Sequence, residues 1–412
     1  MGDDDLTPRE ADTLLAAVIL DDEARQDPVP TYRRFHESLP SWRSASGMTV
    51  LTRYADGLEY LRNPKWGRSE PDMDTPRGFG AATPRVRNET HTMLLLNPPD
   101  HTRIRGLVSR AFTPRRVESL RHRIGALVAP LVDQLGETAD VDLMASLAIP
   151  FPVAVISELL GVPQAETERF VGLARHATSL IDAAADDAAT ELGLGAVMEM
   201  AAYFVELSAH KRAEPDDGLL SALIDVESEG DRLSPEEMIA NTILLYAAGF
   251  ETTSNLIGNG MWALLRHPDQ MKRLREDPGL LPSAIWEMLR YDSPVQLNAR
   301  ALLEDGSLLG RPASRGEQVM ILQGAANHDP HVYEWPERFD VGRFSTDGVP
   351  LPLSFGWGAQ HCLGAHLARA EAELVFGAIL RSYGELEHVG PPPRYRASFT
   401  LRGLDDLRVS FR

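Results

Sequence analysis

The sequence predicts a mainly α-helical protein with a small β-lobe, and three observations lead to this fold class. Apolar residues recur at helical spacing without a break over 235–267, which is about 33 residues, or roughly 50 Å at 1.5 Å per residue. Further helical patterns follow one another between residues 117 and 210, and strand patterns are few and short. No linker, repeat or charge block interrupts the 412 residues. We therefore expect one domain over 1–412, with residues 1–25 as a loosely ordered N-terminal segment.

The shorter elements are predicted from the same periodicities, with proline and glycine marking the breaks between them. Residues 63–90 are rich in Pro, Gly and Arg and are expected to form a loop that can cover a pocket. The predicted helices cover 12–19, 31–37, 55–61, 117–135, 151–160, 166–181 and 192–210, and the predicted strands cover 48–52, 318–322 and 406–411.

A helix is also expected to begin after Pro99. It carries His101 and Arg105, which lie four residues apart and therefore project from one face of the helix. Two donor or cationic groups one turn apart suit a pair of carboxylates. Histidine and arginine at this spacing also occur on many ordinary surfaces, so the pair alone is weak support for an anion site.

The predicted helix over 235–267 has clear start signals. Ser234 and Glu237 form a capping box, and Pro235 occupies the first helical position. Its middle, ILLYAAG, is apolar on every side, so we expect this helix to cross the core. Glu251 and Thr252 follow directly, and an acid beside an alcohol in a dry core costs free energy unless it is paired or used.

Two further expectations concern the same stretch. Thr252 can bond back to the carbonyl of Ala248 and open the helix locally. Gly249 removes a side chain where something flat could lie against the helix. The structural alternative is a satisfied ion in the middle of a helix, together with a kink.

Near the C-terminus, residues 355–364 read FGWGAQHCLG and contain Cys362, the single cysteine of the chain. Three glycines allow this backbone to bend sharply and to approach a flat object. Helical spacing resumes immediately afterwards, so Cys362 is expected at or just before a helix N-terminus. Free N–H groups and the helix dipole favour a thiolate there.

One cysteine cannot build a zinc or iron–sulfur site, but it can be the single proximal ligand of a haem iron. The alternative is that a lone cysteine is a small buried hydrophobic residue. The pattern FGxGxxxCxG followed by a helix resembles the haem-binding signature of the cytochromes P-450. One position departs from it, because the family usually places His or Arg two residues before the cysteine and this chain has Gln360, with His361 beside it. Gln360 is uncharged, which puts that propionate contact in doubt.

Three other motifs resemble the same family and occur in the family's order. HxxxR, at His101 and Arg105, is similar to the propionate-contacting helix. AGFETT is similar to the oxygen-activation motif, in which Thr252 and Glu251 relay protons. ExxR, at Glu287 and Arg290, is similar to a structural network that an arginine from a later loop completes, here Arg338 in PERF.

From about residue 25 to the end, the resemblance implies a cytochrome P-450 fold, a triangular helical prism enclosing haem b. The residues carried over to the haem are His101, Arg105, Ala248, Gly249, Arg300, Phe355, Gly356, Gln360, His361, Cys362 and Gly364, with Cys362 as the iron ligand. Those carried over to the substrate pocket are Leu244, Ala247, Ala248, Val295, Leu297, Phe399 and Thr400.

The implied activity is a monooxygenase that inserts one atom of O2 into a hydrophobic small molecule, by hydroxylation or epoxidation, in secondary metabolism. Two electrons are needed, and the chain has no flavin or iron–sulfur motif of its own. The resemblance therefore implies a ferredoxin and a ferredoxin reductase as electron donors. It also places residues 183–190, which have little to anchor them, beside the substrate pocket as a candidate lid.

Charge and composition limit the other partners. The chain carries 41 basic and 60 acidic residues, a formal net charge of −19, which argues against nucleic acid as a partner. The acidic N-terminus does not resemble a signal peptide, and no long apolar stretch suggests a membrane span. We expect a cytoplasmic monomer. Seven arginines between residues 101 and 123 form a candidate docking face for an acidic ferredoxin, and Arg115 and Arg116 are the residues chosen to test it.

Three alternatives remain open at this stage. A catalytically silent, haem-containing module that recruits other enzymes has no use for Glu251 and Thr252. A gas or redox sensor normally carries an output domain, for which the chain has no residues left. A peroxide-driven enzyme of the same fold is the nearest alternative, and the acid–alcohol pair favours dioxygen over peroxide.

Overall fold

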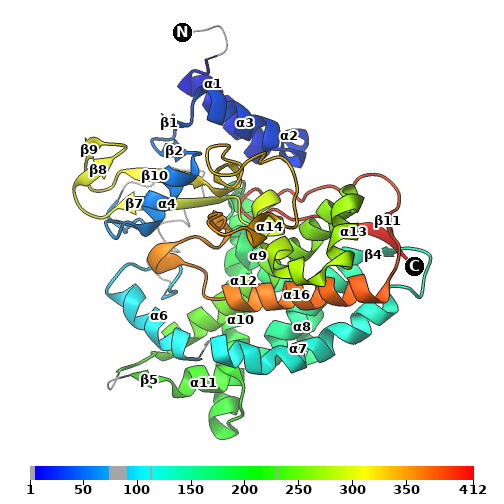
Figure 1. Cartoon of the computed structure of the whole chain (residues 1–412). Coiled ribbons are helices and arrows are strands. Elements are labelled where there is room, and N and C mark those ends of the chain that lie inside the picture. The colour runs from blue at the N-terminus through cyan, green and yellow to red at the C-terminus, as the bar shows by residue number, and fades with distance from the viewer. Residues whose placement is uncertain (1–4, 74–90, 112–113, 229–230) are drawn as a thin grey trace.

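The computed structural model describes residues 5–73, 91–111, 114–228 and 231–412. Figure 1 shows helices filling most of the molecule, with a smaller region of strands beside the N-terminal helices. The described helices of four or more residues are α1 (Pro8–Leu20), α2 (Asp22–Gln26), α3 (Val29–Ser38), α4 (Tyr54–Arg62), α6 (Asp100–Ala111), α7 (Pro114–Gln134), α8 (Pro150–Leu160), α9 (Thr167–Ser179), α10 (Asp187–Ala213), α11 (Leu219–Asp225), α12 (Pro235–Arg266), α13 (Pro268–Glu276), α14 (Leu281–Tyr291), α15 (Gln323–Ala326) and α16 (Ala365–Ser382), with a five-residue π-helical turn at Met144–Ala148.

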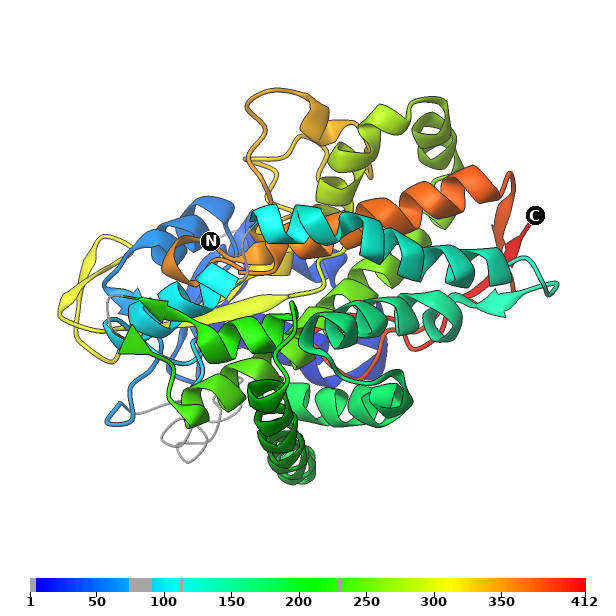
Figure 2. The same cartoon turned by 90° about the horizontal axis from the view of Figure 1, so that it is seen from below.

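Helix α12 is the central element of the helical region. Its 32 residues begin with the predicted capping box, in which the Ser234 hydroxyl accepts from the Glu237 N–H and the Glu237 carboxylate accepts from the Ser234 N–H. Helices α8, α9, α10, α14 and α16 all pack against α12. Figure 2 shows α7 and α16 side by side, which agrees with their extensive packing. The prediction that this helix crosses the core is confirmed.

The larger sheet has five strands in the order β1 (Ser41–Arg43), β2 (Thr49–Leu51), β10 (Gln318–Leu322), β7 (Leu297–Leu302) and β3 (Trp66–Gly67). Strand β10 runs parallel to β2 and antiparallel to β7, and Val319 is paired with both Thr49 and Arg300. The smaller sheet has the order β11 (Leu386–His388), β12 (Arg408–Phe411) and β4 (Val141–Asp142). Two hairpins complete the described strands, β5 (Glu227–Ser228) with β6 (Asp231–Arg232) and β8 (Gly306–Leu308) with β9 (Arg311–Ala313).

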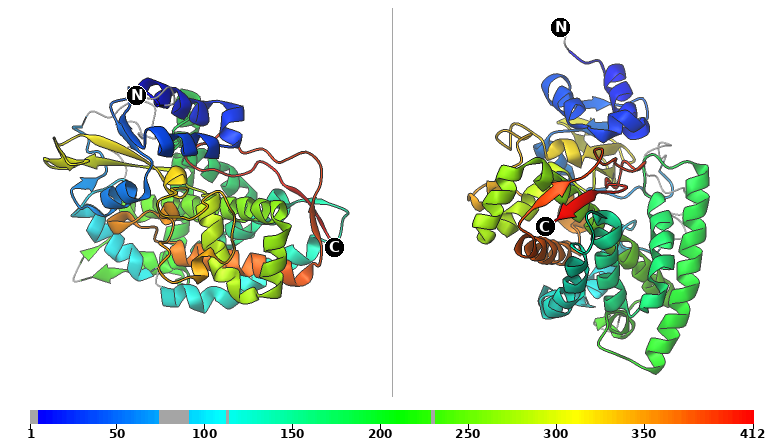
Figure 3. Two further views of the ribbon diagram at one scale, coloured as in Figure 1. Left: turned by 45° about the horizontal axis from the view of Figure 1, so that its top comes forward. Right: turned by 90° about the vertical axis from the view of Figure 1, so that its right-hand side faces the viewer.

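Two hydrophobic clusters show where the two regions are joined. The large one gathers the buried faces of α7, α8, α12, α14 and α16. A second cluster joins α1 and α3 to strands β2, β7 and β10, and it includes Ala183 and Phe399 from much later in the chain. Both views of Figure 3 place the blue N-terminal helices on the side of the molecule that carries β1 and β2.

The expectation of a loosely ordered segment over 1–25 is wrong for its described part. Helix α1 has a complete capping box, formed by Thr7 and Glu10. Its buried face includes Ala11 and Leu15, and the Asp12 carboxylate accepts from the Trp42 ring N–H at 2.7 Å. Apolar burial combined with a cap is sufficient to fix a short helix. The prediction of a single domain stays a prediction.

Residues 183–190 also differ from the prediction of a segment with little to anchor it. The Ala183 N–H donates to the Thr400 hydroxyl at 2.9 Å, and Ala183 is buried. Helix α10 already begins at Asp187, capped by Asp186, whose side chain accepts from the Ala189 N–H. The connection between α9 and α10 is therefore fastened to the C-terminal loop.

Helix α10 is also the one described helix that is long and apolar enough to cross a membrane by length and composition. The most apolar window of α10 has a mean hydropathy of 1.3. The helix packs against α9, α11 and α12. A single helix of this kind is weak support for a membrane span, because core helices of globular proteins share these properties.

Candidate active site

The loop that carries Cys362 is closed by its own backbone. The Cys362 N–H donates to the Phe355 carbonyl at 2.8 Å, so the two ends of the predicted motif meet. Gly356 has φ +64° and Gly358 has φ +70°, in the left-handed region that favours glycine. An added Cβ at Gly358 would also collide with the Leu61 carbonyl oxygen. These glycines allow the loop to turn tightly against the end of α4.

The Cys362 thiol lies just before α16, as predicted, but the helix end does not dominate its ionisation. Burial has the largest influence and raises the pKa of the Cys362 thiol, whereas the backbone N–H groups of Gly364 and Ala365 and the Arg105 charge lower it. Cys362 is nonetheless exposed. Burial and exposure are compatible if the thiol lies deep in the molecule and one of its sides is open. The N–H groups at the helix N-terminus lower the pKa of the thiol, as predicted. Burial raises this pKa by more, so the thiolate is favoured only when a cation binds the sulfur.

Three basic side chains from two elements show how well the site suits the expected haem. His101 of α6 and Arg300 of β7 are both buried, with 2% of each residue exposed. Among the described residues, nothing hydrogen-bonds to His101 Nε2 or to Arg300 Nη2. Arg105 of α6 donates from Nη2 to the His361 carbonyl at 2.5 Å, which ties this helix to the Cys362 loop.

The pKa values of these groups reflect burial without an anion. Burial, followed by the neighbouring arginines, lowers the pKa of His101 to about 4. Burial also lowers the pKa of Arg300 well below its usual value, and to a lesser extent that of Arg105. Buried cations are stable only when paired. The two propionates of a haem would supply the missing negative charge, so these residues fit the expected cofactor.

Gln360 and His361 are both engaged within the protein. The Gln360 side-chain amide donates to the Leu96 carbonyl at 3.2 Å. His361 offers its carbonyl to Arg105, and burial lowers the pKa of its ring. The structure thus gives Gln360 a role in holding the segment before α6, and brings no charge to the position where the family usually has one.

On α12, the acid and the alcohol lie next to the exposed Ala248, whose neighbours Ala247 and Phe250 are buried. The Thr252 hydroxyl donates to the Ala248 carbonyl at 2.9 Å, which confirms the predicted back-bond. Exposure in the middle of a core helix marks the side of α12 that faces open space.

Gly249 faces a neighbouring helix. An added Cβ would lie 3.2 Å from Ile156 Cδ1, so this glycine admits α8 to close packing with α12. Of the two residues predicted to contact a flat group, Ala248 is therefore the one with an open side.

Glu251 is buried, with 3% of the residue exposed, and is held by two arginines that the sequence analysis did not single out. Its Oε1 lies 2.5 Å from Arg396 Nη1, and its Oε2 lies 3.8 Å from Arg175 Nε. Arg175 belongs to α9 and Arg396 to the C-terminal loop. The carboxylate therefore links α12 to α9 and to the C-terminal loop.

Glu287 and Arg290 of α14 form the fully buried pair that was predicted, with Nε–Oε2 2.7 Å and Nη2–Oε1 2.8 Å. The predicted third member is wrong. Arg338 is exposed and contributes only its carbonyl, whereas Arg343 Nε donates to Glu287 Oε2 at 3.0 Å. Two arginines lie five residues apart in PERFDVGRF, and only the second one points inward.

The residues predicted to line the substrate pocket fall into two groups. Val295 forms an isolated bridge with Leu401, and the Gln296 N–H donates to the Thr400 carbonyl, so this strand lies against the C-terminal loop. Leu297 and Phe399 share the second hydrophobic cluster. Leu244 and Ala247 belong to α12. Among the described residues, no hydrogen bond and no shared hydrophobic cluster joins the two groups, and their common pocket stays a prediction.

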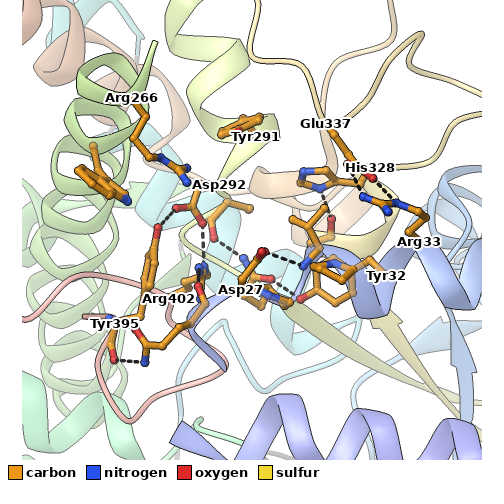
Figure 4. Close-up of a pocket in the computed structure, with 18 of the residues that line it drawn as sticks. Asp27, Tyr32, Arg33, Arg266, Tyr291, Asp292, His328, Glu337, Tyr395 and Arg402 are labelled. Carbon is orange, nitrogen blue, oxygen red and sulfur yellow. Dashed lines mark hydrogen bonds and ion pairs between the residues drawn. The ribbon is translucent and has the colours of Figure 1, made fainter. Parts of the chain in front are cut away.

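A hollow of about 380 Å³ lies elsewhere, between α2, α3, the ends of α12 and α14, and the C-terminal loop. Figure 4 shows that polar side chains lining this hollow bond to one another. Asp292 accepts from Arg402 Nε at 2.8 Å and is also bonded to Tyr395, while Arg33 pairs with Glu337. None of the predicted site residues lines this hollow. We interpret its polar network as structural.

The sequence analysis missed four polar side chains around the site. Arg396 and Arg175 hold Glu251, and Arg68 and Asn298 lie beside Arg300. Asn298 lies between the predicted pocket residue Leu297 and Arg300, and Arg68 lies in the Arg-rich segment over 63–90, so the sequence carried a local signal for these two residues. The three arginines are distant in sequence from every motif.

Comparisons with known proteins place the chain in one family. The family model described as Cytochrome P450 matches residues 194–278 and 279–403. The chain is 39% identical over 415 residues to Cytochrome P450 107B1 of Saccharopolyspora erythraea, covering 98% of this chain and 99% of the relative. It is 41% identical over 396 residues to Vitamin D(3) 25-hydroxylase of Pseudonocardia autotrophica, covering 93% and 94%. The crystal structure of P450BioI with a fatty-acyl-loaded acyl carrier protein superposes with a TM-score of 0.86 at 33% identity, covering 95% of this chain and 99% of that one.

Proposed function

Since the chain belongs to the cytochrome P450 family and is a monooxygenase with a cysteine-ligated haem, we propose that it inserts one oxygen atom into a hydrophobic small molecule of secondary metabolism. The second oxygen atom leaves as water, after two protons and two electrons have been supplied. We further propose a cytoplasmic, monomeric enzyme that takes its electrons from a ferredoxin.

The family supplies the metal chemistry, and this chain supplies the residues that hold and use it. Cys362 would bind the haem iron as a thiolate, and the electron density supplied by its sulfur would favour cleavage of the O–O bond. His101, Arg105 and Arg300 would hold the propionates, and Ala248 would contact the haem from α12. The fold of the loop, with the Cys362 N–H bonded to Phe355, fixes the direction of the sulfur.

The observation that carries the proposal is the pair Glu251 and Thr252 on α12, about one turn from the exposed Ala248. The Thr252 hydroxyl donates to the Ala248 carbonyl, so its oxygen keeps lone pairs that can accept a proton and pass one on. Glu251 is a buried acid one residue away, and its ion pair with Arg396 must loosen before it can exchange a proton. A relay of this kind is a general acid–base device.

Replacing Thr252 by alanine or Glu251 by glutamine is expected to lower product formation by about 10²-fold, the usual effect of losing a general acid–base group. Electron consumption should continue, with the electrons released as reduced oxygen instead of product. The measurement is the ratio of product formed to NAD(P)H consumed in the reconstituted system. Thr253, whose hydroxyl bonds to the Gly249 carbonyl at 3.2 Å, provides the matched control, T253A.

Equal coupling in T252A, E251Q and the wild type would contradict the proton relay. The same variants distinguish the alternatives. A peroxide-driven enzyme would keep its peroxide-supported activity in T252A, and a silent module would show no turnover with either source of oxidant.

The substrate is expected to be apolar and to enter between α12 and the C-terminal loop. Ala247, Leu297 and Phe399, which are apolar residues predicted to line the pocket, are all buried. Thr400 is the polar exception, and its hydroxyl is already committed to the Ala183 N–H. The relatives include one named for vitamin D3, and one neighbouring structure contains a fatty acid on a carrier protein. Both names agree with a hydrophobic substrate.

Several arginines of the candidate docking face over 101–123 form ion pairs within the chain. Arg103 is paired with Glu237, Arg121 with Glu373 and Arg123 with Glu158, so these charges are engaged within the chain. Arg110 is exposed. The side chains of Arg115 and Arg116 lie outside the described residues, and their role in docking stays a prediction.

Exchanging Arg115 and Arg116 for glutamate is expected to slow the first reduction of the protein by roughly tenfold at low ionic strength, because charge mainly steers the encounter. Substrate affinity should not change. Stopped-flow reduction by a ferredoxin and substrate titration measure the two quantities. R9E/R34E, with both arginines exposed on the N-terminal helices, makes the same change in net charge and should leave the rate unaltered. Equal rates in all three proteins, or an equal loss in both variants, would remove the docking face.

A further inference from the structure

Arg68, just after strand β3, lies in the same cluster as the predicted propionate ligands. Its Nη1 donates to Asn298 Oδ1 and to the Ala299 carbonyl, both at 3.3 Å. Arg300 Nη1 donates to the same two oxygens, with 2.8 Å to the Ala299 carbonyl. Two guanidinium groups therefore share one pair of acceptors, which places them side by side although 232 positions separate them in sequence.

This arrangement concentrates positive charge in a poorly solvated place. Arg68, His101 and Arg300 come from three different segments, and burial lowers the pKa of each. Arg68 further lowers the pKa of both other groups. Among the described residues, no carboxylate is hydrogen-bonded or ion-paired to any of the three. Like charges that meet in this way need an anion between them.

The unpaired donors point to the same conclusion. Arg68 Nε, Arg300 Nη2 and His101 Nε2 are all buried and have no hydrogen-bond partner within the described structure. Asn298 and Ala299 satisfy Nη1 of each arginine, whereas Arg68 Nε and Arg300 Nη2 have no partner among the described residues. A buried donor without a partner destabilises the folded protein, and more so if it is charged, so three of them together are difficult to explain as packing.

The position two residues before Cys362 provides the complementary observation. Gln360 is neutral, and its amide is bonded to the Leu96 carbonyl. The positive charge that the family usually has at this position is therefore absent, and the Gln360 side chain binds the Leu96 carbonyl instead. Arg68 brings one positive charge to the same cluster from a different part of the chain.

We propose that Arg68 is a fourth basic ligand of the haem propionates, in addition to His101, Arg105 and Arg300, and that it supplies the charge missing at Gln360. The proposal rests on haem binding by the family, and it assigns a role to a residue outside the four motifs. Arg68 is a positioning residue for the cofactor and takes no part in the chemistry.

The test is the rate at which the ferric protein loses haem to an excess of apomyoglobin. R68Q should lose haem about tenfold faster than the wild type, the effect expected for one charge-assisted hydrogen bond. R68K, which keeps the charge, should stay within about threefold of the wild type. R68Q/Q360H should recover most of the loss. R34Q is the control, because Arg34 is exposed on α3, away from the Cys362 loop.

A second measurement separates a propionate contact from a structural role. Haem dimethyl ester carries no propionate charge, so wild type and R68Q should release it at the same rate, and the difference between them should appear with haem alone. Faster loss of both compounds from R68Q, or equal loss of haem from R68Q and wild type, would overturn the proposal. If R68Q does not fold, a rate of haem loss from R68K far from the wild-type rate would overturn the proposal as well. A thiolate-type spectrum of the wild type with unchanged R68Q kinetics would refute Arg68 alone and leave the proposed function standing.

Discussion

A Cys362→Ser variant is expected to bind haem weakly and to lose oxygenation of substrate by at least about 10³-fold. The alcohol is not ionised near neutral pH, so it cannot give the iron the electron density that a thiolate provides. In the protein, burial already raises the pKa of the Cys362 thiol, and the N–H groups of Gly364 and Ala365 oppose this effect only in part. The metal must therefore complete the ionisation, and serine cannot replace sulfur in this role.

The measurement combines the absorption spectrum of the purified variant with product formation in the reconstituted system. Ala359 serves as a control, because it is exposed on the same loop and A359S adds a hydroxyl without touching the ligand. Turnover in C362S equal to that in A359S would show that sulfur is not the ligand.

The second large effect is expected at the buried pair of α14. Glu287→Gln leaves Arg290 fully buried with no negative partner, and breaking such a pair costs about 3–5 kcal/mol. Arg343 would lose its partner in the same step. Because Arg290 also donates to the Asn327 and Pro336 carbonyls, the whole segment before the Cys362 loop depends on this pair. We expect a protein that retains little haem.

A matched pair of variants tests which arginine completes the network. R343Q should lower the free energy of unfolding by about 2 kcal/mol, as for the loss of a hydrogen bond to a charged group. R338Q should change it by less than about 0.5 kcal/mol, the usual limit for a surface substitution. Urea unfolding followed by the haem absorption measures both. A larger cost for R338Q than for R343Q would restore the original prediction.

Much of this site could be predicted because its motifs are local. The capping box at Ser234 and Glu237, the back-bond of Thr252 and the pair Glu287–Arg290 each involve residues within four positions of one another. At that range the helix geometry alone decides which side chains meet. The Cys362 loop could be predicted equally well, since the glycine spacing and the following helix are both visible in the sequence.

The rest depends on how distant segments pack. Arg343 and Arg338 have similar neighbours in sequence, and only the fold decides which one turns inward. Arg68 and Arg396 reach the site from a strand end and a C-terminal loop, where no periodicity or motif marks them. The hydrogen bond that anchors Ala183 likewise comes from Thr400, more than 200 positions away. Contacts of this kind are tertiary, and a single sequence does not encode them locally.

The assignment of the Cys362 sulfur as the iron ligand is tested most directly by the difference spectrum of the reduced protein with and without carbon monoxide. Thiolate ligation predicts a Soret band shifted far to the red of that given by a histidine-ligated haem. A band at the histidine position in folded, freshly purified protein, or no haem band at all after haem supplementation, would contradict the account.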